Sequence, residues 1–128
     1  MITKKQQQFL AKPLHRGDIV LADLRHARGS EQGGVRPAVV IQNNDGNRRS
    51  NTTIVIPITR QDKCRNIPTH VPLGNVPFLD VRSIAIAEQI TTVDKDYIYG
   101  IMGSLDDALM YKIEHAVRVS IGRKEAFV

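Results

Sequence analysis

The chain has 128 residues, a net charge of +5 and a pI near 9.7, which suit a single basic domain with a polyanionic partner such as nucleic acid. No apolar run is long enough to span a bilayer, and residues 1–17 lack the apolar centre of a secretory signal. Cys64 is the single cysteine, and no Cys-x-x-Cys or His-x-x-x-His spacing occurs. We therefore expect a cytoplasmic protein with no membrane partner, metal or cofactor.

The first third of the chain divides into an arm, a strand, a loop and a second strand. Residues 1–15 are polar, and we expect an N-terminal arm ahead of a domain at residues 16–128. Alternating apolar residues predict a strand at 17–24. A glycine-rich loop at 25–34 separates it from a second predicted strand at 35–43.

The second and third strands are predicted to form a hairpin with an enlarged loop. An Asp-Gly pair within residues 44–51 is a strong turn signal, and residues 52–59 follow as an apolar strand. Pro37 and Pro57 lie inside these two strand patterns. Because proline cannot donate to a ladder, each predicts an edge position, a strand start or a bulge, and such features help a small sheet to curl.

Three more strands are predicted after a basic loop at 60–68. They lie at 69–73, 83–93 and 97–102, the last with a weak pattern. The three add further strands to an antiparallel sheet.

The sequence period then changes from two to about 3.6, which predicts a helix at 104–121. Ser104 is a suitable N-cap and Asp107 completes a capping-box pattern, while Gly122 is a natural stop. The expected apolar stripe consists of Leu105, Leu109, Ile113, Ala116, Val117 and Ile121. The whole pattern predicts a mainly β fold, in which a curved antiparallel sheet forms a half-open barrel and carries a C-terminal helix on one face.

Arg36 stands where the polar loop meets the second strand. Side chains alternate across a strand, so Arg36 and Thr59 both point away from the face formed by the three isoleucines of the third strand. The start of one hairpin strand lies beside the end of the next. We therefore expect Arg36 and Thr59 to be neighbours at the end of the hairpin where the glycine-rich loop lies.

Four segments resemble the MazF/PemK/Kid family of toxin endoribonucleases. They are RGDIVLADL at 16–24, GSEQGGVRPAVVIQN at 29–43, TIVIPIT at 53–59 and IAIAEQITTVDK at 84–95. The second segment, with its Gly-Ser-Glu-Gln-Gly-Gly-x-Arg-Pro pattern, is the most specific. The resemblance covers most of the chain.

This resemblance implies a homodimer with the SH3-like plasmid-maintenance-toxin fold. It implies metal-independent, sequence-specific cleavage of single-stranded RNA by the toxin of a type II toxin-antitoxin system, and a cognate MazE-like antitoxin whose tail occupies the RNA groove. Arg36 and Thr59 match the catalytic pair of the family. The positions that match substrate-binding residues are Ser30, Glu31, Gln32, Gly33, Gly34, Asn43 and Gln89.

The chemistry of RNA cleavage can be assigned to some of these residues. Attack of the 2′-OH on the adjacent phosphorus leaves a 2′,3′-cyclic phosphate and a 5′-OH, and an arginine fork can hold the phosphorane oxygens. Arg36 is a poor general base because arginine is not deprotonated in proteins, so Glu31 and His26 are further candidates for that role. Whether Arg36 only stabilises charge or also moves the proton stays open. The other histidines have no motif around them and are interpreted as structural: His15, His70 and His115.

Two departures and two alternatives remain open. The N-terminal arm is longer than is usual in the family, and Arg25 and Arg28 add charge just before the glycine-rich loop, which predicts salt-sensitive RNA binding. The recognised bases cannot be read from the sequence. A gyrase-targeting toxin of the CcdB type could share the fold without the chemistry, and a non-catalytic nucleic-acid-binding module would retain RNA without cutting it.

Overall fold

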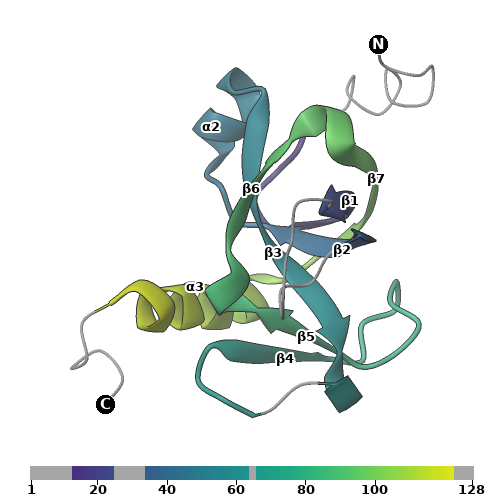
Figure 1. The fold of residues 1–128 in the computed structure, drawn as a ribbon, viewed down its shortest axis with the longest axis vertical. Helices are drawn as coiled ribbons and strands as arrows, with labels where there is room; N and C mark the ends of the chain where they lie inside the picture. The colour runs from purple at the N-terminus through teal and green to yellow at the C-terminus, as the bar shows by residue number, and fades with distance from the viewer. Residues whose placement is uncertain (1–12, 25–33, 64–65, 123–128) are drawn as a thin grey trace.

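A computed structural model describes residues 13–24, 34–63 and 66–122, and its main feature is a seven-stranded antiparallel sheet (Figure 1). The strand order is β4-β5-β3-β2-β1-β7, with β6 paired to β3 beside this path. The strands are β1 (Asp18–Leu24), β2 (Gly34–Val40), β3 (Thr52–Arg60), β4 (His70–Gly74), β5 (Ser83–Ile86), β6 (Thr91–Asp94) and β7 (Ile98–Ser104). The sheet is not closed, since β4 and β7 form its two edges.

Helix α3 (Asp107–Ile121) covers one face of the sheet (Figure 1). Its residues Met110, Ile113 and Ala116 belong to the same buried cluster as Val39 of β2 and Ile56 of β3. Burial of this apolar stripe is what stabilises the helix, because intrinsic helix propensity contributes little. The predicted mainly β fold with a C-terminal helix is confirmed.

The opposite face of the sheet also carries a buried cluster. Ala38, Val40 and Val55 lie there together with Val20 of β1 and Val93 of β6. The sequence predicts only the isoleucine face of β3 as core, and that prediction is incomplete. Strands β2 and β3 are central and bury apolar residues on both sides, so their sequences read as continuous apolar runs.

The predicted hairpin of β2 and β3 is confirmed, but its enlarged connection at residues 44–51 contains the short helix α2 (Asn44–Arg49) instead of an Asp-Gly turn. Strand β2 ends at Val40, and the Asn43 side chain caps α2 by accepting a hydrogen bond from the Gly46 N–H at 2.8 Å. An asparagine at this position satisfies an amide that a helix start leaves unpaired. The cap thus favours a helix over a tight turn.

The single strand predicted at 83–93 is divided in two. Strand β5 pairs with the end of β3 and β6 with its beginning. Between them lies the 3₁₀ turn η2 (Ala87–Gln89), where the Ala87 N–H donates to the Thr69 carbonyl at 2.9 Å. Two further 3₁₀ turns are η1 (Gln61–Lys63) and η3 (Lys95–Tyr97).

The two strand prolines lie on central strands, so the edge interpretation of Pro37 and Pro57 is wrong. Pro37 precedes the stretch of β2 that pairs with β3. Pro57 lies in the gap between the stretches of β3 that pair with β6 and with β5. Each proline therefore stands where a ladder is interrupted on one side of its strand.

The predicted start of the C-terminal helix is displaced by two residues. Ser104 is the last residue of β7, and Asp106 caps α3 by accepting a hydrogen bond from the Leu109 N–H at 2.9 Å. Most of the predicted apolar stripe is buried or partly buried. Ile121 is the exception, since it is 72% exposed.

Candidate active site

The register of the β2–β3 pair brings Arg36 and Thr59 toward each other. The paired stretch ends where Ala38 faces Pro57, and two residues further along the same register Arg36 falls opposite Thr59. Side chains two residues apart share a face of a strand. Both side chains therefore project on the face of Ala38, as the sequence predicts.

This pair lies at the margin of the second buried cluster. Ala22 of β1 faces Arg36 across the ladder, and Ile84 of β5 faces Thr59 on its other side. Arg36 is partly buried and Thr59 is only 7% exposed. A cation and a hydroxyl beside apolar side chains interact with an anion more strongly than they would in bulk water, because the local dielectric constant is lower.

Gly34 is the one described residue of the predicted substrate loop. It begins β2 with φ +78°, a backbone conformation that L side chains rarely adopt, and a Cβ built on it would meet no atom within 4 Å. An anion can therefore approach this backbone closely. The other predicted loop residues lie outside the described residues: Ser30, Glu31, Gln32 and Gly33.

Asn43 is not brought together with Arg36 within one chain. It follows the opposite end of β2, roughly 20 Å away along the strand direction at 3.3 Å per residue. Its side-chain oxygen is engaged as the cap of α2. A substrate that contacts both Asn43 and Arg36 of one chain would have to span this distance.

Gln89 ends the η2 turn and is partly buried. Next to it lies a polar pair that the sequence analysis did not identify. His70 Nε2 lies 2.9 Å from Glu88 Oε2, and the His70 side chain is 9% exposed against 39% for Glu88. The pair has no local sequence signal, since 18 residues separate its members and only the β4–β5 ladder brings them together.

Two opposing effects act on the pKa of Glu88. Burial raises it, but hydrogen bonds from the Glu88 backbone, the Thr69 side chain and His70, together with the charge of His70, outweigh burial and hold it below its ordinary value of 4.5. Glu88 is therefore an anion at neutral pH.

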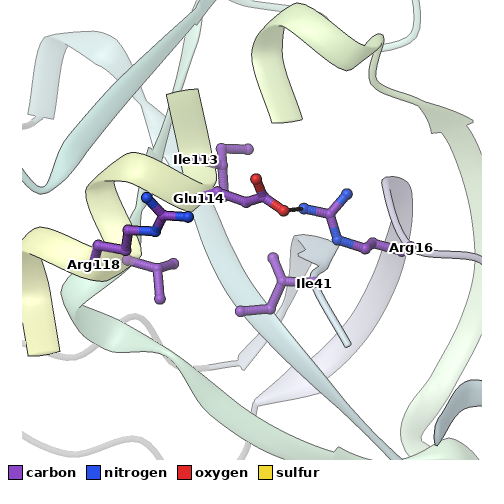
Figure 2. Close-up of a pocket in the computed structure, with 6 residues that line it drawn as sticks. Arg16, Ile41, Ile113, Glu114 and Arg118 are labelled. Carbon is purple, nitrogen blue, oxygen red and sulfur yellow. Dashed lines mark hydrogen bonds and ion pairs between the residues drawn. The ribbon is translucent and has the colours of Figure 1, made fainter. Parts of the chain in front are cut away.

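A pocket of about 230 Å³ lies away from this region, between α3 and the end of β2 (Figure 2). Arg16 and Glu114 form an ion pair across it, above the apolar side chains of Ile41, Ile113 and Val117. Ile41 follows the end of β2 remote from Arg36, so this pocket is separate from the predicted catalytic pair.

Two further observations bear on function. Within residues 13–24, 34–63 and 66–122, no group of three or more His, Cys, Asp or Glu side chains could hold a metal ion. No helix in the described part of the chain is both long and apolar enough to cross a membrane.

Known proteins resemble this chain in sequence and in fold. A family model described as a PemK-like, MazF-like toxin of type II toxin-antitoxin systems matches residues 15–121. Endoribonuclease MazF of Staphylococcus saprophyticus is 43% identical over 110 residues, which are 85% of this chain and 92% of that protein. A mycobacterial endoribonuclease solved with its cognate antitoxin is 27% identical, with a TM-score of 0.71 over 84% of this chain and 94% of that one.

The fold alone is matched by MazF of Deinococcus radiodurans. Its structure has a TM-score of 0.75 at 19% identity and covers 88% of this chain and 99% of that one. This chain thus has an open antiparallel sheet, a C-terminal helix and an arginine at a strand start. Its relatives are toxins of one class. The chain belongs to the PemK-like, MazF-like family of toxins of type II toxin-antitoxin systems. The predicted family and the endoribonuclease reading are confirmed, and neither alternative is supported.

Proposed function

We propose that this endoribonuclease toxin cuts single-stranded mRNA at a short sequence without a metal ion, and so arrests translation and growth. The 2′-OH of the substrate attacks the adjacent phosphorus, and the cut leaves a 2′,3′-cyclic phosphate and a 5′-OH. The observation that supports this proposal is the β2–β3 register, which pairs Ala38 with Pro57 and, extended by two residues, would bring Arg36 opposite Thr59 at the end of β2 that begins with Gly34.

Arg36 stabilises the charge that develops in the transition state. Its planar fork of donors matches two phosphate oxygens at once. The flanking apolar residues Ala22 and Ala38 reduce competition from water. Preorganised donors of this kind are often the largest single term in catalysis, at about 3–4 kcal/mol for one donor.

Thr59 and Gly34 supply weaker contacts to the same phosphate. The Thr59 hydroxyl can donate one neutral hydrogen bond to a phosphate oxygen. At Gly34 no side chain blocks the backbone. Together the three residues form a clamp that binds phosphate and orients the attacking and leaving oxygens.

The general base lies elsewhere, and Glu31 and His26 of the glycine-rich loop are our candidates. His70 is an unsuitable base because β5 and β3 stand between β4 and β2. Three strand spacings separate His70 from Arg36 laterally by roughly 14 Å, too far for direct proton transfer in the same site.

The active form is a homodimer in the cytoplasm that is inhibited by a cognate MazE-like antitoxin. The RNA would bind in a groove that the antitoxin tail can occupy in its place. The residues that we propose to contact the RNA are Ser30, Glu31, Gln32, Gly33, Gly34, Asn43 and Gln89. We assign the toxin domain to residues 16–128, with the N-terminal segment 1–15 preceding it.

Digestion of a long RNA of mixed sequence in EDTA tests the proposal. Primer extension then maps each cut, and phosphorylation by polynucleotide kinase reports new 5′-OH ends. We expect cuts at one recurring short sequence with 5′-OH ends. RNA that stays intact at enzyme excess, or that is cut only when a divalent metal is added, would contradict the proposal.

A further inference from the structure

We propose that Thr69, His70 and Glu88 act as a positioning unit that fixes the Gln89 side chain for contact with RNA. The inference deepens the proposed function and rests on it. It assigns a role to a polar cluster that lies outside the catalytic pair and concerns how tightly the substrate is held rather than how fast it is cut.

Three contacts fasten η2 to the beginning of β4. The Ala87 N–H donates to the Thr69 carbonyl at 2.9 Å, and the Glu88 carboxylate lies 2.9 Å from His70 Nε2. The Thr69 side chain also hydrogen-bonds to Glu88. Two of the three residues of η2 are therefore tied to one short segment of the neighbouring strand.

The turn is held by packing at its first residue, since Ala87 is fully buried in the first core cluster, and by the polar contacts of Glu88 at its second. It is three residues long, and the residue before it, Ile86, makes no side-chain hydrogen bond as its cap. Short 3₁₀ segments have poor internal hydrogen-bond geometry. Gln89 is the last residue of η2 and directly follows Glu88, so the contacts that hold Glu88 also hold the backbone from which the Gln89 side chain leaves.

The burial of the unit strengthens these contacts. The His70 ring is almost fully enclosed, while Glu88 is partly open to solvent. A hydrogen bond to an ionised carboxylate is stronger than one between neutral groups. The pair thus holds η2 more firmly than an exposed surface ion pair would.

The proposed function assigns Gln89 to the groove for RNA. Strand β5, which leads into η2, pairs with the end of β3, where Ile84 faces Thr59. The Gln89 amide supplies two donors and an acceptor, the groups that recognise base edges of unstacked RNA. A fixed amide loses less conformational entropy on binding, and each side chain left free would weaken binding by about three- to tenfold.

A double-mutant cycle with Glu88→Ala and Gln89→Ala tests the inference. The substrate is an RNA oligonucleotide that contains the mapped cut sequence, and kcat and KM are measured for each variant. We expect Glu88→Ala to raise KM about three- to tenfold with little change in kcat. In the Gln89→Ala background it should add nothing, because residues that act as one unit are not additive.

Conservative variants separate positioning from general damage to the fold. Glu88→Gln and His70→Gln keep a hydrogen-bonding partner and should restore most of the binding that Glu88→Ala and His70→Ala lose. Glu114→Ala, which removes an exposed glutamate of the remote pocket, should leave KM unchanged. Thermal unfolding of every variant checks that the fold persists.

The same cycle is run on binding of an oligonucleotide with a 2′-deoxy residue at the cut site. Additive effects of Glu88→Ala and Gln89→Ala on Kd, or an unchanged Kd in Glu88→Ala, would overturn the inference. If the wild type binds this RNA but does not cut the ribose form, the proposed function fails while the cycle still decides the inference. If the wild type neither binds nor cuts RNA, both are overturned.

Discussion

The backbone around Arg36 is constrained on both sides. Pro37 restricts the preceding backbone to an extended conformation, and Gly34 turns the chain into β2 with a positive φ. The side chain therefore leaves the strand at a defined point, on the face of Thr59. A guanidinium that is positioned before substrate arrives requires little reorganisation in the transition state.

Thr59→Val isolates the hydroxyl of the second member of the pair. Valine preserves the branched shape at this buried position, so the fold should be retained. Losing one neutral hydrogen bond should slow cleavage by about tenfold, and Thr59→Ser should stay close to wild type. Single-turnover cleavage of a matched oligonucleotide measures both variants, and a full rate in Thr59→Val would remove this residue from the mechanism.

Among the elements, α2 depends on a single buried asparagine. Asn47 is 2% exposed, and its side-chain oxygen accepts hydrogen bonds from Thr53 at 2.7 Å and Gln42 at 3.1 Å. Its side-chain nitrogen donates to the Gln42 carbonyl at 3.0 Å. These contacts join α2 to the strands on either side of it.

Asn47→Ala should lower the free energy of unfolding by about 2 kcal/mol, because it leaves the buried Thr53 hydroxyl without its acceptor. Urea unfolding measures the change. Arg48→Ala, in the same helix but exposed and paired with the exposed Asp45, is the control and should change stability by less than about 0.5 kcal/mol. Equal effects of the two substitutions would contradict the role given to Asn47.

The start of α3 gives a second prediction at this scale. Asp106→Ala should cost about 1 kcal/mol, since it removes the side-chain acceptor for the Leu109 amide. Ser104→Ala should be nearly neutral because Ser104 ends β7 and is exposed. Thermal or urea unfolding distinguishes them, and a larger loss in Ser104→Ala would favour the start predicted from the sequence.

The elements that the sequence predicts well are those in which apolar residues follow a long, unbroken pattern. Strands β1 and β3 and helix α3 have such patterns. The segment at 44–51 does not, because an Asp-Gly pair suits both a turn and a capped helix, and the choice depends on burial of Asn47. The break between β5 and β6 arises from pairing with two different stretches of β3, which a local pattern does not contain.

The same reasoning applies to the candidate site. Arg36 and Thr59 belong to adjacent strands, so alternation and hairpin geometry were enough to predict that they are neighbours. His70 and Glu88 meet through the β4–β5 ladder and the η2 turn, neither of which has a sequence signature. The sequence is therefore enough to propose Arg36 and Thr59 as the catalytic pair, whereas it leaves His70 as an isolated structural histidine.

For the whole molecule, the net charge of +5 predicts a salt-dependent affinity for RNA. If about three phosphates are neutralised, log K should fall with log salt at a slope of about −2 for a single strand. Fluorescence anisotropy with the 2′-deoxy-blocked oligonucleotide at several salt concentrations measures this slope. An affinity that does not change with salt would rule out phosphate contacts as the main source of binding.

The most direct test of the account is the single-turnover cleavage rate of Arg36→Ala in EDTA, measured beside wild type on the mapped oligonucleotide. Circular dichroism and gel filtration establish that the variant keeps its fold and its assembly. We predict a rate lower by about 100- to 1,000-fold, as expected for loss of one preorganised donor, with Arg36→Lys between the two. A folded Arg36→Ala protein that cuts RNA at the wild-type rate would contradict the central claim.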